Sequence, residues 1–179
     1  MAYDLFQHRH NFAAWAAARA TQRGFTSTEN LIDALSGCGV VAFLRNPTCA
    51  NTDYDKFETL HRQWCSAVCQ SLQKRGIAHV TYGRAAKLVA VYLKSTVVLG
   101  LAPASPLAAV AHPPIDRILL QKLSRAGAIH SPHRQSWSKV NWTELEPEEY
   151  YELVGQLRAS LQPEQPFWML EEYWSPTRD

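Results

Sequence analysis

The sequence predicts an all-α protein, a compact domain of about six to eight helices. Three observations favour this class. Apolar residues recur with helical spacing along most of the chain, several segments open at Ser, Thr, Asp or Pro and end near Gly, and no segment alternates apolar and polar residues as a strand does. With 179 residues, 46% of them hydrophobic and 19% charged, the chain is long enough for one domain with a substantial core.

The first two helices are predicted over residues 11–23 and from residues 26–29 to Gly37. From Phe12, apolar residues recur at i+3, i+4 and i+8, which puts Phe12 and Trp15 on one buried helical stripe. Residues 26–29 have the form of a capping box, so we expect them to open the second helix.

A longer helix is predicted over residues 53–75, with Thr52 as its N-cap. Its apolar residues share one face and form a continuous stripe: Phe57, Leu60, Trp64, Val68 and Leu72. Residues 40–44, which precede it, are apolar but too few to assign to an element.

Two further helices frame the most informative part of the chain. The first follows Gly83 and carries Lys87, and its apolar stripe comprises Leu88, Val91, Tyr92 and Val98. A loop over residues 101–111 then leads to a pair of prolines, residues 113–114, which we expect to open a helix that ends near Gly127.

The C-terminal part is predicted to be less regular. Residues 128–143 are polar, Pro147 opens a helix, and residues 165–173 form a final aromatic helix or strap. We therefore expect a single helical domain over residues 1–179. Its parts are N-terminal helices over 1–80, a helix–loop–helix over 81–127 that we expect to be catalytic, and a C-terminal loop with helices over 128–179.

The net charge of +2 conceals a strong asymmetry along the chain. Residues 1–143 carry 16 Lys and Arg against 7 Asp and Glu, whereas residues 144–179 carry 2 against 9. A basic body with an acidic C-terminal segment is typical of a protein with a polyanion-binding face. The alternative is that solvated faces of opposite charge segregate without function.

The four cysteines form no Cys-x-x-Cys pair. Cys65 and Cys69 stand at i and i+4 with His61 one turn earlier, so a metal site with Cys49 as fourth ligand is conceivable on spacing alone. Buried free cysteine is the commoner state in an intracellular protein, and we expect no metal and no cofactor.

The sequence favours a protein with no membrane partner. No apolar run approaches the roughly 18 residues that a membrane-spanning helix requires. Residues 1–8 lack the basic and apolar regions of a signal peptide. We therefore expect a cytoplasmic location, and the sequence leaves the oligomeric state open.

Lys87 and Asp116 stand out because each lies in a segment that otherwise indicates buried core. A buried charge is unfavourable unless it is paired or functional, and a lysine with an aspartate suffices for covalent catalysis by an amine. Two ordinary interpretations remain open. In the first, Lys87 and Lys94, which are two turns apart, are surface residues whose aliphatic stems lie along the helix. In the second, Asp116 serves only as the cap of the next helix.

The segment from Gly83 to Lys94, followed after a loop by His-Pro-Pro-Ile-Asp at residues 112–116, resembles the core of the helix–hairpin–helix DNA glycosylases. The likeness is greatest to the 8-oxoguanine type with a lysine nucleophile, in its compact archaeal and bacterial branch. In those enzymes a Gly-containing hairpin leads into the helix that bears the lysine. A Pro-Val-Asp or Pro-Ile-Asp tripeptide opens the next helix with the catalytic aspartate. The resemblance covers about 40 of the 179 residues.

This resemblance implies roles for particular residues. Lys87 is the implied nucleophile, with Lys94 as the alternative, and Asp116 stabilises positive charge on the sugar or handles the lysine proton. Aromatic side chains are expected to line a base pocket: Trp15, Trp64, Phe167 and Trp168. DNA phosphates are expected to contact Gly83, Arg84, Arg117 and Lys122.

The function that we expect from the resemblance is a DNA glycosylase with AP lyase activity, excising a damaged or modified base such as 8-oxoguanine through a lysine Schiff base. DNA is then the partner, and the target nucleotide has to leave the duplex because its C1′ is out of reach within the stack. The alternative is a catalytically silent helical module that binds nucleic acid or a protein, for example in bacterial defence.

Overall fold

The computed structural model describes residues 3–175, apart from the side chain of residue 101. All regular secondary structure in the described residues is helical and none of it is strand, so the predicted all-α class is confirmed. The α-helices are α1 (Leu5–Gln22), α2 (Thr28–Gly37), α3 (Val40–Leu44), α4 (Tyr54–Lys74), α5 (Tyr82–Leu93), α6 (Pro106–Val110), α7 (Arg117–Arg125), α8 (Arg134–Trp137) and α9 (Pro147–Arg158). The shorter or irregular helical segments are η1 (Pro47–Asn51), the π-helix η2 (Lys94–Leu101), η3 (Trp142–Glu144) and η4 (Phe167–Tyr173).

The predicted helices all occur, but the structure adds short ones. The helices α3, α6 and α8 have only four or five residues each, too few to show a helical period in the sequence. One of them, α6, lies in residues 101–111, which we had predicted to be a loop. The described range therefore contains more helical segments than the six to eight expected.

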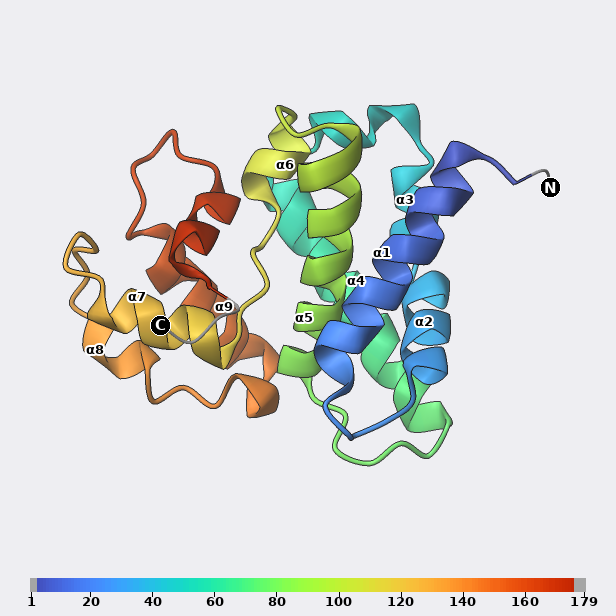
Figure 1. Cartoon of the computed structure of the whole chain (residues 1–179), viewed down its shortest axis with the longest axis horizontal. Helices are drawn as coiled ribbons and strands as arrows, with labels where there is room; N and C mark the ends of the chain where they lie inside the picture. The colour runs from blue at the N-terminus through green and yellow to red at the C-terminus, as the bar shows by residue number, and fades with distance from the viewer. Residues whose placement is uncertain (1–2, 176–179) are drawn as a thin grey trace.

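The central element is α5, which runs between two groups of helices (Figure 1). α1, α2 and α4 lie on one side of it, and α7, α8, α9 and η4 lie on the other. Ten of the twelve residues of α5 are buried, which makes this helix the core of the molecule. A functional group on α5 is consequently held by packing on all sides.

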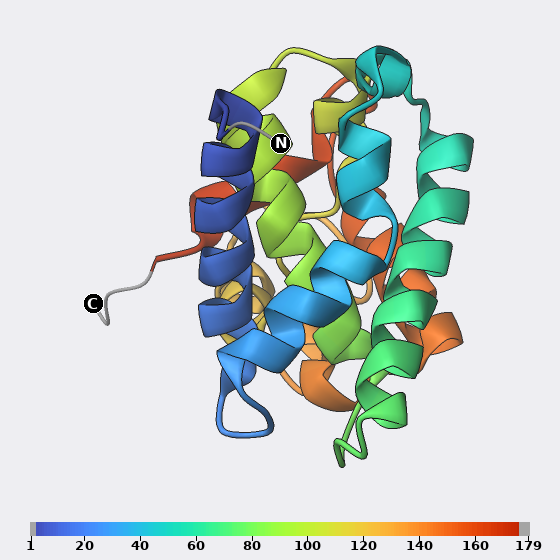
Figure 2. The ribbon, with the colours of Figure 1, turned by 90° about the vertical axis from the view of Figure 1, so that its right-hand side faces the viewer.

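α1 packs along α5 through small side chains. Its buried residues are Ala13, Ala14, Ala17, Ala18 and Thr21, and α5 presents Ala85, Ala86 and Ala90 among its buried residues. Small residues on both partners allow two helices to approach closely. Figure 2 shows the upper part of α5 beside α1, and the two helices are in contact.

This packing corrects the predicted buried stripe of the first helix. Phe12 is 63% exposed and Trp15 is 51% exposed, so the two aromatic rings point away from the core. The helix also begins earlier than predicted, at Leu5, because Asp4 accepts a hydrogen bond from the backbone N–H of Gln7. The apolar period is compatible with either face of α1, and the alanine face is the one that fits against α5.

Helix caps account for the other boundaries. Ser27, one residue after the predicted capping position, caps α2 through its hydroxyl and the N–H of Asn30. Asp53 caps α4 in place of Thr52. α7 begins at Arg117 and not at the prolines, because Asp116 is its N-cap in extended conformation.

The start of α5 is fixed by a close backbone contact at Gly83. A Cβ at this position would lie 2.0 Å from the backbone oxygen of Trp142, and the Gly83 N–H donates to the Leu145 carbonyl at 2.9 Å. Only a residue without a side chain lets η3 and the following turn pack on the helix here. Gly83 therefore serves packing between α5 and the C-terminal part.

No helix in the described part of the chain is both long enough and apolar enough to cross a lipid bilayer.

We predict that Gly83→Ala destabilises the protein by about 3 kcal/mol or more, because the new methyl group overlaps a backbone oxygen that cannot rotate away. Gly155→Ala is the matched control: it is an exposed glycine within α9 with no neighbouring atom near the new Cβ. That change should stabilise by about 0.5–1 kcal/mol. Urea unfolding followed by circular dichroism measures both, and equal stabilities of the two variants would contradict the packing described here.

Candidate active site

Lys87 and Asp116 meet in the interior of the protein. The Lys87 Nζ donates to Asp116 Oδ2 at 3.0 Å, and the two residues are 5% and 4% exposed. They lie 29 positions apart in the sequence, one on the second turn of α5 and the other at the start of α7. The structure thus brings together the two residues that the sequence singled out, and places them as a buried ion pair.

Asp116 is positioned by its local role as a helix cap. Its Oδ1 accepts the backbone N–H of Leu119 at 3.0 Å, which satisfies one of the free donors at the start of α7. Oδ2 is thereby directed away from α7 and accepts both the Lys87 ammonium and the indole N–H of Trp174, at 3.0 and 3.4 Å. The capping and pairing roles use different oxygens and coexist.

Lys87 is held from the opposite side by an aromatic ring. Its Nζ lies 4.6 Å from the centroid of the buried Trp142 ring, a geometry suited to a cation–π contact. Trp142 belongs to η3, the segment that Gly83 admits against α5. The close approach at Gly83 therefore also supplies a partner for the catalytic candidate one turn later.

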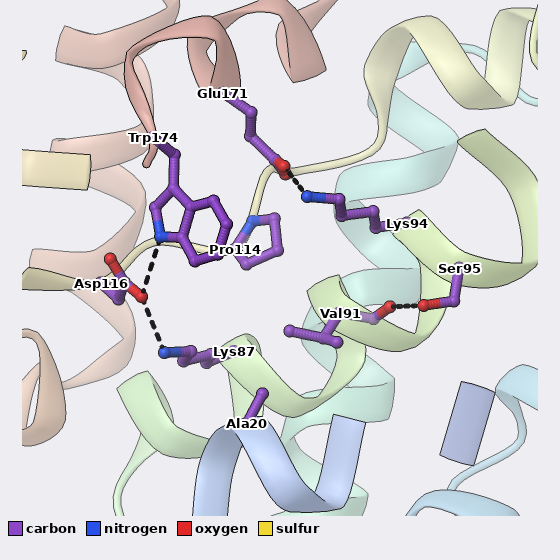
Figure 3. Close-up of a pocket in the computed structure, with 9 residues that line it drawn as sticks. All are labelled: Ala20, Lys87, Val91, Lys94, Ser95, Pro114, Asp116, Glu171 and Trp174. Atoms are coloured by element: carbon purple, nitrogen blue, oxygen red, sulfur yellow. Dashed lines mark hydrogen bonds and ion pairs between the residues drawn. The ribbon is translucent and has the colours of Figure 1, made fainter. Parts of the chain in front are cut away.

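A pocket of about 190 Å³ opens beside this pair (Figure 3). Lys87, Val91, Lys94 and Ser95 line it from α5 and η2, and Ala20 lines it from α1. Its other wall comprises Pro114, Asp116, Glu171 and Trp174. The pocket thus lies where the N-terminal helices, α5 and the C-terminal strap (residues 167–174) come together.

The environment shifts the pKa values of both members of the pair. Burial lowers the pKa of Lys87, and the positive charge of Arg23 lowers it further, against the opposing effect of Asp116. Burial by itself would raise the pKa of Asp116, but the Lys87 charge, the Leu119 N–H and the Trp174 indole outweigh it and hold that pKa below its usual value. The lysine is therefore easier to deprotonate than a surface lysine, beside a carboxylate that stays ionised.

Lys94 occupies a different position on the pocket wall. It forms an ion pair with Glu171 of the strap, and its side chain is 30% exposed. Its Nζ also lies 5.5 Å from the Trp174 ring centroid. The helix changes from α to π geometry at this residue, an irregularity that is frequent at functional sites. Lys94 lies beside the pocket with its own counter-ion, whereas Lys87 shares Asp116.

The four aromatic residues predicted to line the base pocket are not among the described residues that line it. Trp15 is exposed on the outer face of α1, and Trp64 is buried against Phe43 and Phe57. Phe167 is fully buried against His112. Trp168 lines a neighbouring hollow that shares Lys94 and Glu171 with this pocket. The structure therefore does not bring these four side chains to this pocket, because helical periodicity cannot say which side of a helix meets which neighbour.

The aromatic residue that does line the pocket is Trp174. It lies one residue beyond the strap that the sequence predicts, which ends at residue 173. No local pattern marks Trp174, since its role depends on the strap folding back over the start of α7. Trp142, the ring beneath Lys87, was missed for the same reason.

The structure places the four predicted phosphate contacts in different environments. Gly83 is buried and its N–H already donates to the Leu145 carbonyl, so this donor is not available to a phosphate. Arg84 lies over the Phe25 ring at 4.5 Å, with two of its guanidinium nitrogens buried. Arg117 is exposed at the start of α7, and Lys122 is half-buried one turn further on. The phosphate contacts of Arg117 and Lys122 remain predictions.

Of the conceivable metal ligands, His61 and Cys65 are in contact, with 3.6 Å between Nε2 and Sγ, but Cys49 and Cys69 bond elsewhere. His61 bonds through Nδ1 to the Tyr151 hydroxyl at 2.7 Å, while the Cys69 thiol donates to the Thr81 carbonyl and the Cys49 thiol donates to the Leu44 carbonyl. Within residues 3–175, no group of three or more His, Cys, Asp or Glu side chains is arranged to hold a metal ion. The cysteines of the described chain are free thiols.

Comparison with known proteins returns no matching family model, no matching curated protein and no matching solved structure. The site has therefore to be interpreted from its own geometry.

We predict that Asp116→Asn destabilises the protein by about 3 kcal/mol, because it leaves the Lys87 ammonium buried without a counter-charge. Asparagine keeps the helix cap, so the loss reports the ion pair alone. In the double variant Lys87→Met with Asp116→Asn no buried charge remains, and its stability should return to within about 1 kcal/mol of the wild type. Urea unfolding at neutral pH measures this cycle, and additive losses in the double variant would show that the two groups do not interact.

Proposed function

We propose that this protein is a DNA glycosylase with AP lyase activity that uses Lys87 as its nucleophile. The observation that carries the proposal is the buried Lys87–Asp116 pair beside a pocket. A lysine of lowered pKa, bonded to an ionised carboxylate and facing a cavity, is the arrangement that amine nucleophiles require. The resemblance of residues 83–94 and 112–116 to lysine-dependent glycosylases supports the same conclusion.

The chemistry follows from the two groups. Asp116 takes a proton from the Lys87 ammonium through their hydrogen bond, and the neutral amine attacks C1′ of a flipped-out nucleotide. The bond from C1′ to the base breaks, and the base leaves with the electron pair and takes up a proton. The sugar ring opens to a Schiff base on Lys87, removal of a C2′ proton expels the 3′ phosphate, and water then releases the lysine. The proton that the base takes up comes from Asp116, which, once it is a carboxylate again, stabilises the positive charge that develops on the sugar-derived Schiff base.

The size and lining of the pocket support one flat nucleobase as the group bound. Its volume of about 190 Å³ corresponds to about six water molecules. Trp174 offers an aromatic face, Val91 and Pro114 offer apolar contacts, and Glu171 offers a carboxylate to the polar edge of a base. The Glu171 Oε1 is buried and has no hydrogen-bond partner, so an acceptor is free in the wall.

Lys87 is favoured over Lys94 on two counts. Lys87 is bonded to the carboxylate that would accept its proton, and its pKa is lowered by burial. Lys94 is more exposed and is paired with Glu171, a residue of the strap and not of the α7 cap. In this proposal Lys94 and Glu171 shape the pocket.

We predict that borohydride traps a covalent adduct between the protein and a duplex containing an abasic site or 8-oxoguanine. Lys87→Gln should abolish the adduct, because it removes the amine that is bonded to Asp116. Lys74→Gln, which changes an exposed lysine at the end of α4, is the matched control and should leave the adduct unchanged. Denaturing gel electrophoresis measures the product.

Each other outcome has a definite meaning. Loss of the adduct in Lys94→Gln with retention in Lys87→Gln would identify Lys94 as the nucleophile and refute the assignment made here. No adduct with either substrate, while the folded protein still binds DNA, would instead favour the non-catalytic binding module.

We also predict that the trapping rate at saturating abasic DNA rises with pH and levels off below pH 10.5, the ordinary pKa of a lysine. The sign follows because only the neutral amine attacks, and a lowered pKa makes that form abundant at lower pH. Arg23→Gln removes a charge that lowers the pKa of Lys87 and should move the profile to higher pH. If the pH profile of the trapping rate is unchanged in Arg23→Gln, Lys87 is not the titrating group.

A further inference from the structure

We infer that the outer face of α1 is a binding surface for single-stranded DNA beside the nucleotide held in the pocket. The surface, called here the α1 stripe, comprises Phe12, Trp15 and Arg19. This inference rests on the proposed function for the identity of the bound strand as DNA, but the residues of the stripe are separate from the Lys87 site. Three independent features of the stripe support it.

The first feature is a pair of exposed aromatic rings. Phe12 and Trp15 are 63% and 51% exposed, and their ring centroids are 6.0 Å apart with the planes tilted by 42°. Two large apolar side chains in contact with each other and open to solvent are unfavourable in a protein that has no partner for them. Rings of this kind are stacking platforms for unpaired bases.

The second feature is charge. α1 carries Arg9 and Arg19 and contains no Asp or Glu between Leu5 and Gln22. Arg19 is exposed one turn beyond Trp15, and Arg23 follows directly after the helix. Aromatic rings interleaved with arginines, in a helix without acidic side chains, complement a polyanion that also presents bases. An apolar protein partner would not complement these positive charges.

The third feature is continuity with the pocket. Phe12, Ala16 and Ala20 stand at i, i+4 and i+8, so they form one row along α1. Ala20 lines the pocket wall. Because Ala16 and Ala20 have short side chains, no bulky group of this row stands between the Phe12 ring and the pocket. A strand lying on Phe12 and Trp15 can therefore follow this row to the pocket. Arg23, at the same end, lies 5.7 Å from the Trp142 ring that also contacts Lys87.

We predict that Phe12→Ala with Trp15→Ala weakens binding of a fluorescein-labelled oligothymidylate by about tenfold or more, the effect expected from losing a stacked base. Both rings are exposed, so the variant should fold, which circular dichroism verifies. Leu99→Ala, which removes the most exposed of the large apolar side chains outside α1, is the control and should bind as the wild type does. Fluorescence anisotropy measures the affinity, and Arg19→Gln should reduce its salt dependence where Lys74→Gln does not.

The same variants separate this inference from the proposed function. The stripe variant should still give full borohydride trapping at saturating abasic DNA, and Lys87→Gln should still bind oligothymidylate. Binding without any adduct in the wild type would leave the stripe in place and refute the glycosylase proposal. Unchanged affinity in the stripe variant overturns the inference. A change from dimer to monomer in sedimentation, with affinity unchanged, would do so by identifying the stripe as a contact between copies.

Discussion

The ion pair between Lys87 and Asp116 is the interaction on which the arrangement of this protein depends. Two buried charges are unfavourable unless they are paired, and the structure pairs them with each other. The carboxylate accepts the lysine, the Leu119 N–H and the Trp174 indole, and the ammonium also lies over Trp142. These partners come from α7, the strap and η3, so the pair ties the C-terminal half of the chain to α5.

The alanine-lined contact between α1 and α5 has a consequence for the surface. Because only small side chains fit between these helices, the large aromatic residues of α1 are turned outward. The same contact brings Ala20 to the edge of the pocket and Arg23 near Lys87. The contact between α1 and α5 therefore determines both how α1 meets the pocket and which residues of α1 are exposed.

Asp116 shows how a local and a long-range role are combined in one residue. The sequence left two interpretations open, an ordinary helix cap and a catalytic acid. In the structure Oδ1 caps α7 while Oδ2 faces Lys87 and the pocket, so the cap holds the carboxylate in the orientation that the pair needs. A capping aspartate is rigid at its backbone, which suits a group that has to stay near a reacting atom.

The sequence by itself determined the helical class, the long helices and the pair of candidate residues. These depend on local signals: the apolar period, the capping sequences near residues 26–29 and 52–53, which place a helix start to within one residue, and charges placed inside apolar segments. The tertiary structure alone decided which face of α1 is buried, that Gly83 serves packing, and that Trp174 and not Trp64 lines the pocket. Those outcomes depend on which helices meet and how closely, and a period of 3.6 residues is the same whichever neighbour a face meets.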